Sequence, residues 1–191
     1  MKPILFNTEM VQAILEGRKT VTRRPIKPQP SEGLRRMGAD SCYPGCFAAN
    51  GEDRVYRPPY MAGDVLYVRE TWTRIAVSPD GHFFPPGVNY YKAGPIEAPK
   101  NTMIKWRPSI HMPRDAARIF LRVTGVRVER LQEIDNAGVV AEGLEIGCYF
   151  DELWNRTVKP KDRYVYGWEA NPWVWVIEFE RISKEEADDG T

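Results

Sequence analysis

The segment IFLRVTGVRVERL, residues 119–131, carries the strongest strand signal of the chain. Branched and polar residues alternate along it, which favours one long strand or two strands with a bend at Gly125. The segments PWVWVIEFERI at 172–182 and GDVLYVRETW at 63–72 also have a period of two. This period is typical of strands with one buried face. The three segments therefore predict a mainly β core.

Helical patterns flank these strands. Residues 4–16 predict a helix that begins after Asn7 or Thr8 and ends at Gly17, because a glycine after the last periodic residue commonly terminates a helix. We expect RKTVTRR at 18–24 to enter a strand that stops at Pro25. Two more short helices are expected at 132–142 and 149–155.

Two long stretches interrupt this pattern, at about 28–62 and 75–108, and both are rich in proline and glycine. Neither is long enough for a core of its own. We therefore expect a single domain over residues 1–182 with two irregular insertions, followed by a frayed acidic tail at 183–191. The order of elements predicts an α+β, mainly β fold: a small, mostly antiparallel barrel with short helices at its openings.

The composition excludes several classes of protein. The chain has 191 residues, of which 42% are hydrophobic and 28% charged, and its 16 prolines and 15 glycines argue against a helical bundle. No apolar run approaches the ~20 residues of a membrane-spanning helix. The start, with Glu9 inside its apolar stretch, does not fit a signal peptide. The three cysteines form no disulfide framework, which favours a reducing cytoplasm.

The net charge of +1 is unevenly distributed. The first 36 residues carry +5, and residues 129–191 carry −8. A basic front of this kind could form a positive surface on one side. The alternative is an ordinary solvated surface with an acidic tail, and charge alone favours it.

The segment GRKTVTRR at 17–24 gathers four cations and two hydroxyls. Neighbouring arginines and burial both lower the pKa of a lysine such as Lys19. A lysine with a lowered pKa can act as a base that activates a nearby hydroxyl. The alternative is a basic strand that faces solvent or a phosphate backbone, and composition alone favours it.

The segment RPSIHMPRDAAR at 107–118 places Ser109 and His111 among arginines and prolines. Residues two apart do not face each other productively, so a positively charged loop for substrate or nucleic acid is the better interpretation. A metal site is not expected, because no second ligand pair accompanies Cys42 and Cys46 at zinc spacing. Cys148, His82 and His111 are the other side chains that could in principle act as ligands of such a metal site. We expect no metal or organic cofactor.

Several motifs follow one another along the chain: I-L-x-G-R-K-T with V-T-x-R at Ile14–Arg24, G-D-V-L-x-V at Gly63–Val68, V-x-x-L within Val128–Glu142, and V-I-E-F at Val176–Phe179. They stand in the order of the ASCH family, which the chain resembles. The fuller pattern, which includes KPILFNTEMV and RPSIHMPRDAAR, is similar to ASCH proteins of phages and prophages. The resemblance covers essentially the whole chain. It implies a PUA-like β-barrel, a fold associated with RNA and nucleotide binding.

Small bacterial members of this family are N4-acetylcytidine amidohydrolases, which use a Lys, a Thr and a Glu. The resemblance implies that Lys19 accepts a proton, that Thr22 is the nucleophile or positions the attacking water, and that Glu142 donates a proton. In a regular strand, positions 19 and 22 point to opposite faces, so the two side chains meet only where the chain turns or bulges. An anionic Glu142 raises the pKa of Lys19, against the effect of the arginines.

Two functions of different class follow as hypotheses. The first is a hydrolase that removes an acyl group from a modified pyrimidine nucleoside. The second is a phage-type module that binds nucleic acid, RNA rather than DNA, with or without nuclease activity. A weaker third option is a regulatory or virion-assembly role in which the pocket is vestigial. We expect action in the bacterial host cytoplasm and no membrane partner. The residues expected to bind substrate or nucleic acid are Arg18, Arg23, Arg24, Arg69, Glu70, Trp72, Arg107, Ser109, His111 and Arg114.

Overall fold

The computed structural model describes residues 1–77, 83–95 and 104–189. Within them the chain is an α+β protein that consists mostly of strands with short helices between them. The strands are β1 Lys2–Leu5, β2 Val21–Pro25, β3 Leu34–Arg36, β4 Phe47–Ala49, β5 Val55–Tyr56, β6 Val65–Arg69, β7 Trp72–Val77, β8 Phe83–Tyr91, β9 Phe120–Arg130 and β10 Trp173–Ile182. The α-helices are α1 Thr8–Leu15, α2 Asn136–Ala141, α3 Phe150–Thr157, α4 Arg163–Tyr166 and α5 Lys184–Asp189. Single 3-10 turns are η1 Ser109–His111, η2 Arg114–Ala116, η3 Leu131–Glu133 and η4 Pro160–Asp162.

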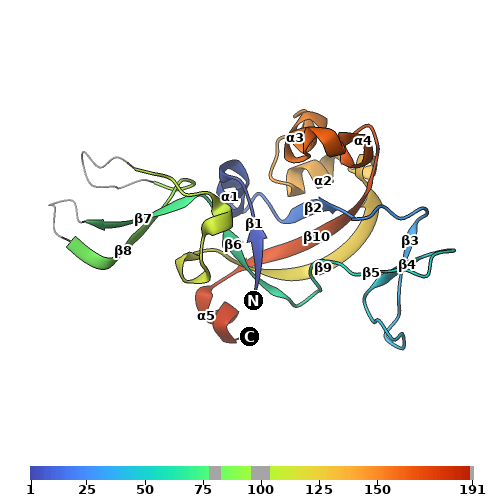
Figure 1. Ribbon diagram of the computed structural model, residues 1–191, viewed down its shortest axis with the longest axis horizontal. Coiled ribbons are helices and arrows are strands. Elements are labelled where there is room, and N and C mark those ends of the chain that lie inside the picture. Colours follow the sequence, from blue (N-terminus) through green and yellow to red (C-terminus); the bar gives the residue numbers. More distant parts are fainter. Residues whose placement is uncertain (78–82, 96–103, 190–191) are drawn as a thin grey trace. The chain divides into compact units, whose positions relative to one another are not determined.

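The main sheet has five strands in the order β1-β6-β9-β10-β2. It is mixed, because β1 and β6 are parallel whereas β6 pairs with β9, and β10 with β2, in antiparallel fashion. Figure 1 shows β2 alongside β10. The α+β class agrees with the sequence. Among the described strands, however, β1 and β2 end the order without pairing to each other, so the sheet is open and no closed barrel is formed.

The expected insertions contain regular structure. Strands β3, β4 and β5 form a three-stranded antiparallel sheet within residues 28–62. Strands β7 and β8 form a separate hairpin that contains residues 75–77 and 83–91 of the second stretch. The prediction of irregular segments was therefore wrong for these strands. Their short lengths and the prolines and glycines around them hide the period of two that longer strands display.

The chain divides into two compact units. The first comprises Met1–Gly17, Val65–Arg122 and Arg181–Thr191, and the second comprises Arg18–Asp64 and Val123–Glu180. Each unit has its own buried clusters. One cluster of the first unit contains Val65, Phe120, Ile182 and Ala187. One cluster of the second unit contains Leu131, Trp154, Val158, Val174 and Val176.

Helix α1 begins and ends as its sequence predicts. The side chain of Asn7 accepts a hydrogen bond from the Met10 amide at 2.8 Å and caps the first turn. Gly17 follows the last turn with a φ of +76°, in the left-handed region that glycine adopts at little cost. The chain therefore leaves α1 at a defined point, just before Arg18 and Lys19.

Strand β10 is buried on both faces over Val174–Ile177, although its alternation predicted one buried face. On one face, Val174 and Val176 pack with Trp154 of α3. On the other, the ring of Trp175 meets Phe47 of β4 at 5.1 Å between centroids. A strand that is covered on both sides loses the contrast between its faces.

Residues 184–189 form helix α5, in which Ala187 is fully buried, so this part of the acidic tail is not frayed. The apolar contact of Ala187 with the cluster around Val65 explains the difference. Among the described residues, no helix has the length and apolar character needed to span a membrane.

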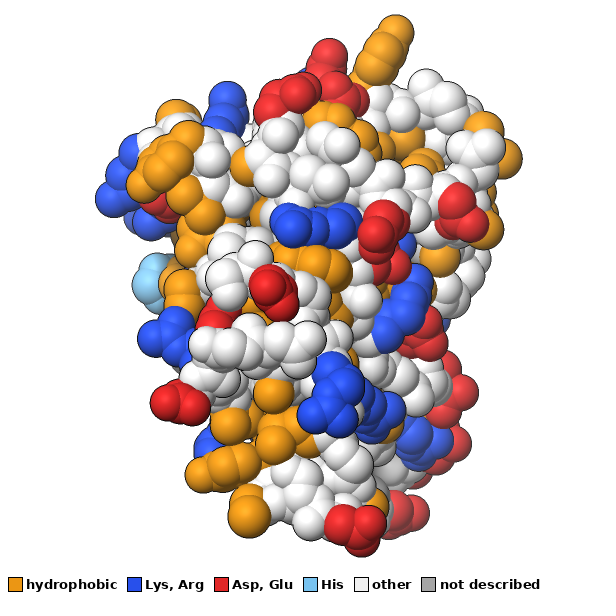
Figure 2. Space-filling model, turned by 90° about the vertical axis from the view of Figure 1, so that its right-hand side faces the viewer, with side chains coloured by type: hydrophobic (Ala, Val, Ile, Leu, Met, Phe, Trp, Pro, Cys, Tyr) orange, Lys and Arg blue, Asp and Glu red, His pale blue; other side chains and the backbone are white. Residues whose placement is uncertain are grey.

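Lys and Arg side chains are interspersed with Asp and Glu on the face that Figure 2 presents. Part of the basic front of the chain pairs directly with the acidic back. Lys19 and Arg23 both contact Glu142, and Arg23 also contacts Glu129. The uneven distribution of charge along the sequence is therefore partly neutralised inside the second unit.

Candidate functional site

Lys19 lies between Gly17 and β2, where the chain departs from regular strand geometry. It forms an isolated antiparallel bridge with Glu142. The next residue, Thr20, donates its amide to Ala141 O and accepts from the Phe179 amide, both at 2.9 Å. The amide and carbonyl of one residue in a regular strand point to the same neighbouring strand, whereas those of Thr20 point to different elements. The chain is therefore irregular at Thr20.

Glu142 is held at the C-terminal end of α2. Asp135 caps the start of this helix, and the Glu142 amide donates to Gly138 O at 3.0 Å in its last turn. Gly143 then ends the helix with a φ of +86°. A helix C-terminus carries partial negative charge, so a cation is stabilised beside it and a carboxylate is not. Glu142 therefore needs the cations that surround it.

The ammonium of Lys19 supplies one of these cations. Its Nζ lies 2.5 Å from Glu142 Oε2, 3.0 Å from Glu142 O and 2.8 Å from Val21 O. An ammonium has three hydrogens to donate, and these three acceptors can take all of them. Lys19 is thereby fixed between the helix end and the edge of β2.

Arg23 holds the other oxygen of the same carboxylate. Its backbone amide donates to Glu142 Oε1 at 2.8 Å, and its Nη1 lies 3.3 Å from that oxygen. Its Nε donates to Glu129 Oε1 at 2.7 Å. Arg127 extends the network by contacting Glu129 Oε2 at 3.1 Å and Glu178 Oε1 at 2.5 Å. Lys19 and Arg23 thus form the buried end of a chain of ion pairs that becomes exposed at Arg127.

Water is excluded from the Lys19–Glu142 pair. The Lys19 side chain is 0% exposed, and that of Glu142 is 6% exposed. Burial lowers the pKa of Lys19 below its usual 10.5, because removal from water disfavours the charged amine. Glu142 opposes this effect, whereas Arg24 and Arg23 add to it. Burial also lowers the pKa of the Arg24 guanidinium.

Thr22 lies in β2, opposite Ile177 of β10, and is 1% exposed. The amide that follows it, that of Arg23, is the donor to Glu142 Oε1, so the main chain of Thr22 adjoins the carboxylate. Strand alternation places the Thr22 side chain on the face opposite to Arg23. The structure therefore brings together Lys19 and Glu142 through side chains, and Thr22 through its backbone.

The Lys19–Glu142 pair covers the edge of β2 that is not paired with β10. The amide of Ile26 donates to Trp173 O, so the backbone amide and carbonyl groups of the even-numbered residues in this segment point toward β10. Val21 O and the Arg23 amide face the other way, toward Lys19 and Glu142. Covering an edge strand in this manner is a structural role that the pair fulfils whatever its chemistry.

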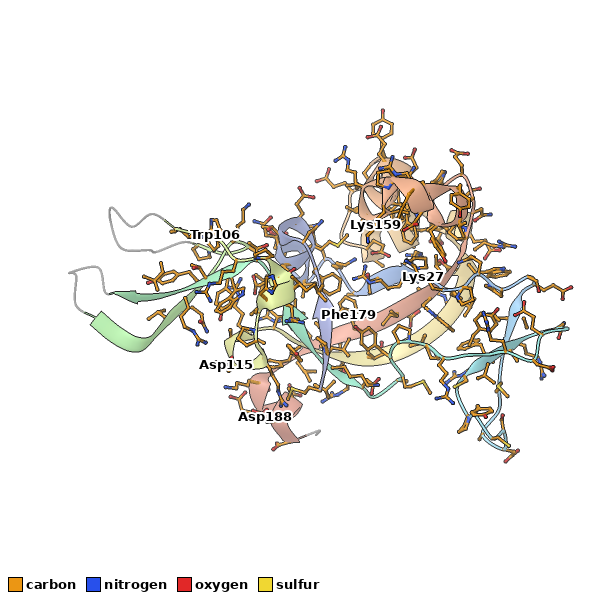
Figure 3. The ribbon with its side chains drawn as sticks, in the orientation of Figure 1. Lys27, Trp106, Asp115, Lys159, Phe179 and Asp188 are labelled. Carbon is orange, nitrogen blue, oxygen red and sulfur yellow. The ribbon has the colours of Figure 1, made fainter. Side chains whose placement is uncertain are left out.

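A cavity of about 400 Å³ lies beside this arrangement in the second unit. Four cations and one carboxylate line it, namely Arg23, Arg24, Lys27, Lys159 and Asp162, together with the aromatic side chains of Trp154 and Tyr166. Figure 3 shows Lys27 and Lys159 near each other, from the segments that follow β2 and α3. Lys19, Thr22 and Glu142 are not among the lining residues, so Arg23 connects the cavity with the buried pair.

The remaining predicted residue of the second unit is Arg18. It is exposed, and its Nη1 donates to Gly143 O at 2.5 Å, next to the end of α2. This contact fastens the helix end to the segment before β2. Arg18 thus lies adjacent to the pair without belonging to it.

The first unit contains the other predicted binding residues. Glu70 is 1% exposed and receives two hydrogen bonds of 2.9 Å from Arg118, so its carboxylate is occupied. Arg69 donates to the carbonyls of Met112 and Ile110. These contacts tie β6 to the segment around η1 and account structurally for both side chains.

Trp72 is buried and Arg107 is exposed, with the guanidinium 5.5 Å from the ring centre. Ser109 and His111 share the turn η1, in which residues two apart do not face each other. Arg114 is half exposed and forms a long contact of 3.8 Å with Asp188. Arg107 and Arg114 are thus exposed cations within 107–118, and a binding role for this segment stays a prediction, whereas the Ser-X-His pair gains no support.

Several contributors to the site could not be predicted from the sequence. Glu129 lies in β9, and its approach to Arg23 depends on the arrangement of the sheet. Lys27, Lys159 and Tyr166 meet around the cavity from separate segments. Each has an ordinary local sequence, so only the tertiary fold reveals them.

No group of three or more His, Cys, Asp or Glu side chains in the described part of the chain is arranged to hold a metal ion. Cys42, Cys46 and Cys148 are free thiols. His82 lies outside the described residues.

No family model matches the chain, and no curated protein matches it. A solved structure that it resembles is the crystal structure of protein EF3133 from Enterococcus faecalis V583, described with the family model DUF984. The two share 10% sequence identity with a TM-score of 0.44, over 96% of this chain and 82% of that one.

Proposed function

We propose that the protein is a hydrolase that removes an acyl group from a modified pyrimidine nucleoside such as N4-acetylcytidine. Lys19 is the proton acceptor, Thr22 the nucleophile and Glu142 the proton donor. The observation that carries the proposal is the water-excluded contact of 2.5 Å between Lys19 Nζ and Glu142 Oε2, beside the main chain of Thr22. The motif positions around these residues support membership of the ASCH family and its PUA-like fold, here with an open sheet, and action in the bacterial cytoplasm.

The buried pair can contain both a base and an acid. An ammonium that donates all three hydrogens has no lone pair, so Lys19 must lose a proton before it can accept one. Glu142 Oε2 is the closest of its acceptors. Transfer of that proton leaves a neutral amine and a neutral carboxylic acid, and burial favours neutral forms over charged ones.

The reaction then uses each group once. The Lys19 amine takes the proton of the Thr22 hydroxyl, and the hydroxyl oxygen bonds to the acetyl carbon. The C–N bond breaks as Glu142 gives its proton to the departing amine. Water hydrolyses the resulting ester and releases acetate. In the alternative route, water attacks the acetyl carbon directly and Thr22 holds it in position.

Acetate release from N4-acetylcytidine tests this function. We expect turnover by the wild type and a loss of about 10²–10⁴-fold in kcat for Lys19→Met and Glu142→Gln, since each removes a proton-transfer group. Arg127→Gln, at the exposed end of the same ion-pair network, serves as the control and retains the wild-type rate. Circular dichroism confirms that each variant is folded. Absence of turnover by the wild type on a panel of acylated nucleosides refutes the proposal.

A second candidate is a nucleic-acid-binding module without amidohydrolase activity. The observation in its favour is the exposed Arg107 on the ring of Trp72, with Arg74 5.6 Å from the same ring centre. Arg23 is engaged by two carboxylates and does not contribute to this candidate. We expect RNA binding to weaken with salt, with a smaller slope in Arg107→Gln and Arg114→Gln. Binding that is independent of ionic strength excludes it.

A further inference from the structure

The two oxygens of the Glu142 carboxylate have unequal surroundings. Oε1 accepts two hydrogen bonds, from the Arg23 amide at 2.8 Å and from Arg23 Nη1 at 3.3 Å. Oε2 accepts from Lys19 Nζ at 2.5 Å, and within the described part of the chain this is its one donor. A carboxylate oxygen has about two lone-pair sites, so those of Oε1 are filled whereas one of Oε2 is open.

This asymmetry decides where a proton can be added to Glu142. On Oε1, the added hydrogen would face the hydrogens of the Arg23 amide and guanidinium, and a buried donor would lose its acceptor. Such a loss is costly in a site that excludes water. On Oε2, the proton lies between this oxygen and the Lys19 nitrogen, so a hydrogen bond is kept when the proton moves from one atom to the other.

The Arg23 side chain is held firmly enough to maintain this difference. It is 2% exposed, and its Nε donates to Glu129 Oε1 at 2.7 Å. Its Nη2 lies against α2 at Gly138, where an added Cβ would stand only 2.9 Å from this nitrogen. The glycine therefore leaves the space that the guanidinium occupies. The second donor to Oε1 is the Arg23 amide, which belongs to the main chain of β2.

We propose that Arg23 is a positioning residue that keeps Glu142 Oε1 as an acceptor, so that Oε2 carries the proton exchanged with Lys19. In the exchange, one N–H bond of the Lys19 ammonium breaks and an O–H bond forms at Oε2, which leaves a neutral amine and a neutral carboxylic acid. Arg23 acts through Glu142 and forms no bond to the reacting groups. The use of this proton in acyl transfer rests on the proposed function, whereas its location on Oε2 does not.

Infrared difference spectroscopy of the full chain during an acid titration tests this assignment without relying on turnover. The carbonyl stretch of a protonated carboxyl falls in frequency as the carbonyl oxygen accepts more hydrogen bonds, because each donor weakens the C=O bond. The band of Glu142 is the one that is absent from Glu142→Gln. With the proton on Oε2, the carbonyl oxygen is Oε1, so the frequency of the band should depend on Arg23.

Two variants should move this band in opposite directions. Arg23→Lys keeps the positive charge but not the guanidinium fork, so the Nη1 bond to Oε1 is lost and the band should move to higher frequency. Glu129→Gln removes the charge that holds Arg23 Nε, so the guanidinium should bind Oε1 more strongly and the band should move to lower frequency. A general loosening of the site would raise the frequency in both variants.

The matched control is Arg127→Lys, the same substitution in the same ion-pair network. Arg127 contacts the other oxygen of Glu129 and is half exposed, so this change should leave the band in place. Circular dichroism establishes that each variant is folded. If Arg23→Lys does not fold, the direction of the shift in Glu129→Gln decides the question.

The outcomes separate this proposal from the catalytic one. A band that ignores Arg23→Lys, a shift of the same sign in both variants, or the absence of any band from protonated Glu142 overturns the proposal even if acetate is released. Opposite shifts with an unchanged control uphold it even if no acylated nucleoside is hydrolysed, a result that would refute the proposed function alone.

Discussion

Lys19 and Glu142 are joined through both their backbones and their side chains. The two residues form an antiparallel bridge, and the Lys19 ammonium contacts both the carboxylate and the carbonyl of Glu142. The segment before β2 and the end of α2 are therefore locked together at one point. This double connection gives the pair a structural role in addition to the chemistry that we propose for it.

Loss of the Lys19 ammonium should destabilise the fold. Lys19→Met leaves a buried carboxylate with one cation fewer, and breaking a buried pair typically costs about 3 kcal/mol or more. Arg127→Gln, which breaks the half-exposed pair with Glu178 and the contact with Glu129, should cost less than Lys19→Met, because the Arg127 side chain is itself half exposed. Urea unfolding measures both free energies. Equal costs for the two variants would contradict the importance that we assign to the buried pair.

The pKa of Lys19 should respond in opposite directions to its two kinds of neighbour. Burial lowers it, Glu142 raises it and Arg24 lowers it. Arg24→Gln should therefore raise the pKa of Lys19, and Glu142→Gln should lower it further. Nitrogen-15 NMR of the lysine amines during a pH titration measures this directly. Shifts of the same sign in both variants would exclude these electrostatic assignments.

Glu52 should make the small β3–β5 sheet sensitive to acid. Hydrogen bonds from Ser31 and Tyr56 lower the pKa of Glu52 to about 2. A carboxyl with a depressed pKa stabilises the folded state above its unfolded pKa of about 4.3, and this contribution is lost as the pH falls toward its folded pKa. Glu52→Gln should therefore flatten the pH dependence of stability between about 4.3 and 2.

Thermal unfolding at a series of pH values checks this expectation for Glu52. Glu32→Gln, a change of an exposed carboxyl in the same part of the chain, is the control and should keep the wild-type slope. An unchanged slope in Glu52→Gln would rule out the assigned hydrogen bonds.

Gly17 should resist substitution for conformational reasons alone. A Cβ at this position meets no heavy atom within 4 Å, but its φ is +76°. Gly17→Ala should therefore cost about 1 kcal/mol through backbone strain. Gly38 also has open space, without a left-handed φ, so Gly38→Ala should be neutral or slightly stabilising. Denaturant unfolding of the two variants decides the matter, and equal effects would count against a strained helix end.

Local signals made part of this fold predictable. The cap at Asn7 and the glycine at Gly17 fixed the ends of α1, because both act through nearby backbone groups. The long alternating segments predicted β9 and β10. The three residues of the expected catalytic group are all buried, and two of them are in direct contact, although their roles remain predictions.

Long-range pairing accounts for what could not be predicted. Whether a sheet closes into a barrel depends on whether its two end strands pair. The local sequences of β1 and β2 do not show whether these two strands pair with each other. The contact between Arg23 and Glu129 joins residues that are far apart in sequence, and it exists only in the folded register. The cavity is likewise lined by Lys27 and Lys159 from separate segments, and neither segment by itself predicts a cavity.

Acetate release by a pair of Thr22 variants tests the catalytic account most directly. Thr22→Val keeps the shape of this buried side chain and removes its hydroxyl, whereas Thr22→Ser retains the hydroxyl. With N4-acetylcytidine as substrate, we predict that wild type and Thr22→Ser release acetate and that the rate for Thr22→Val falls by about three orders of magnitude. A folded Thr22→Val protein that hydrolyses the substrate as fast as the wild type would contradict the account.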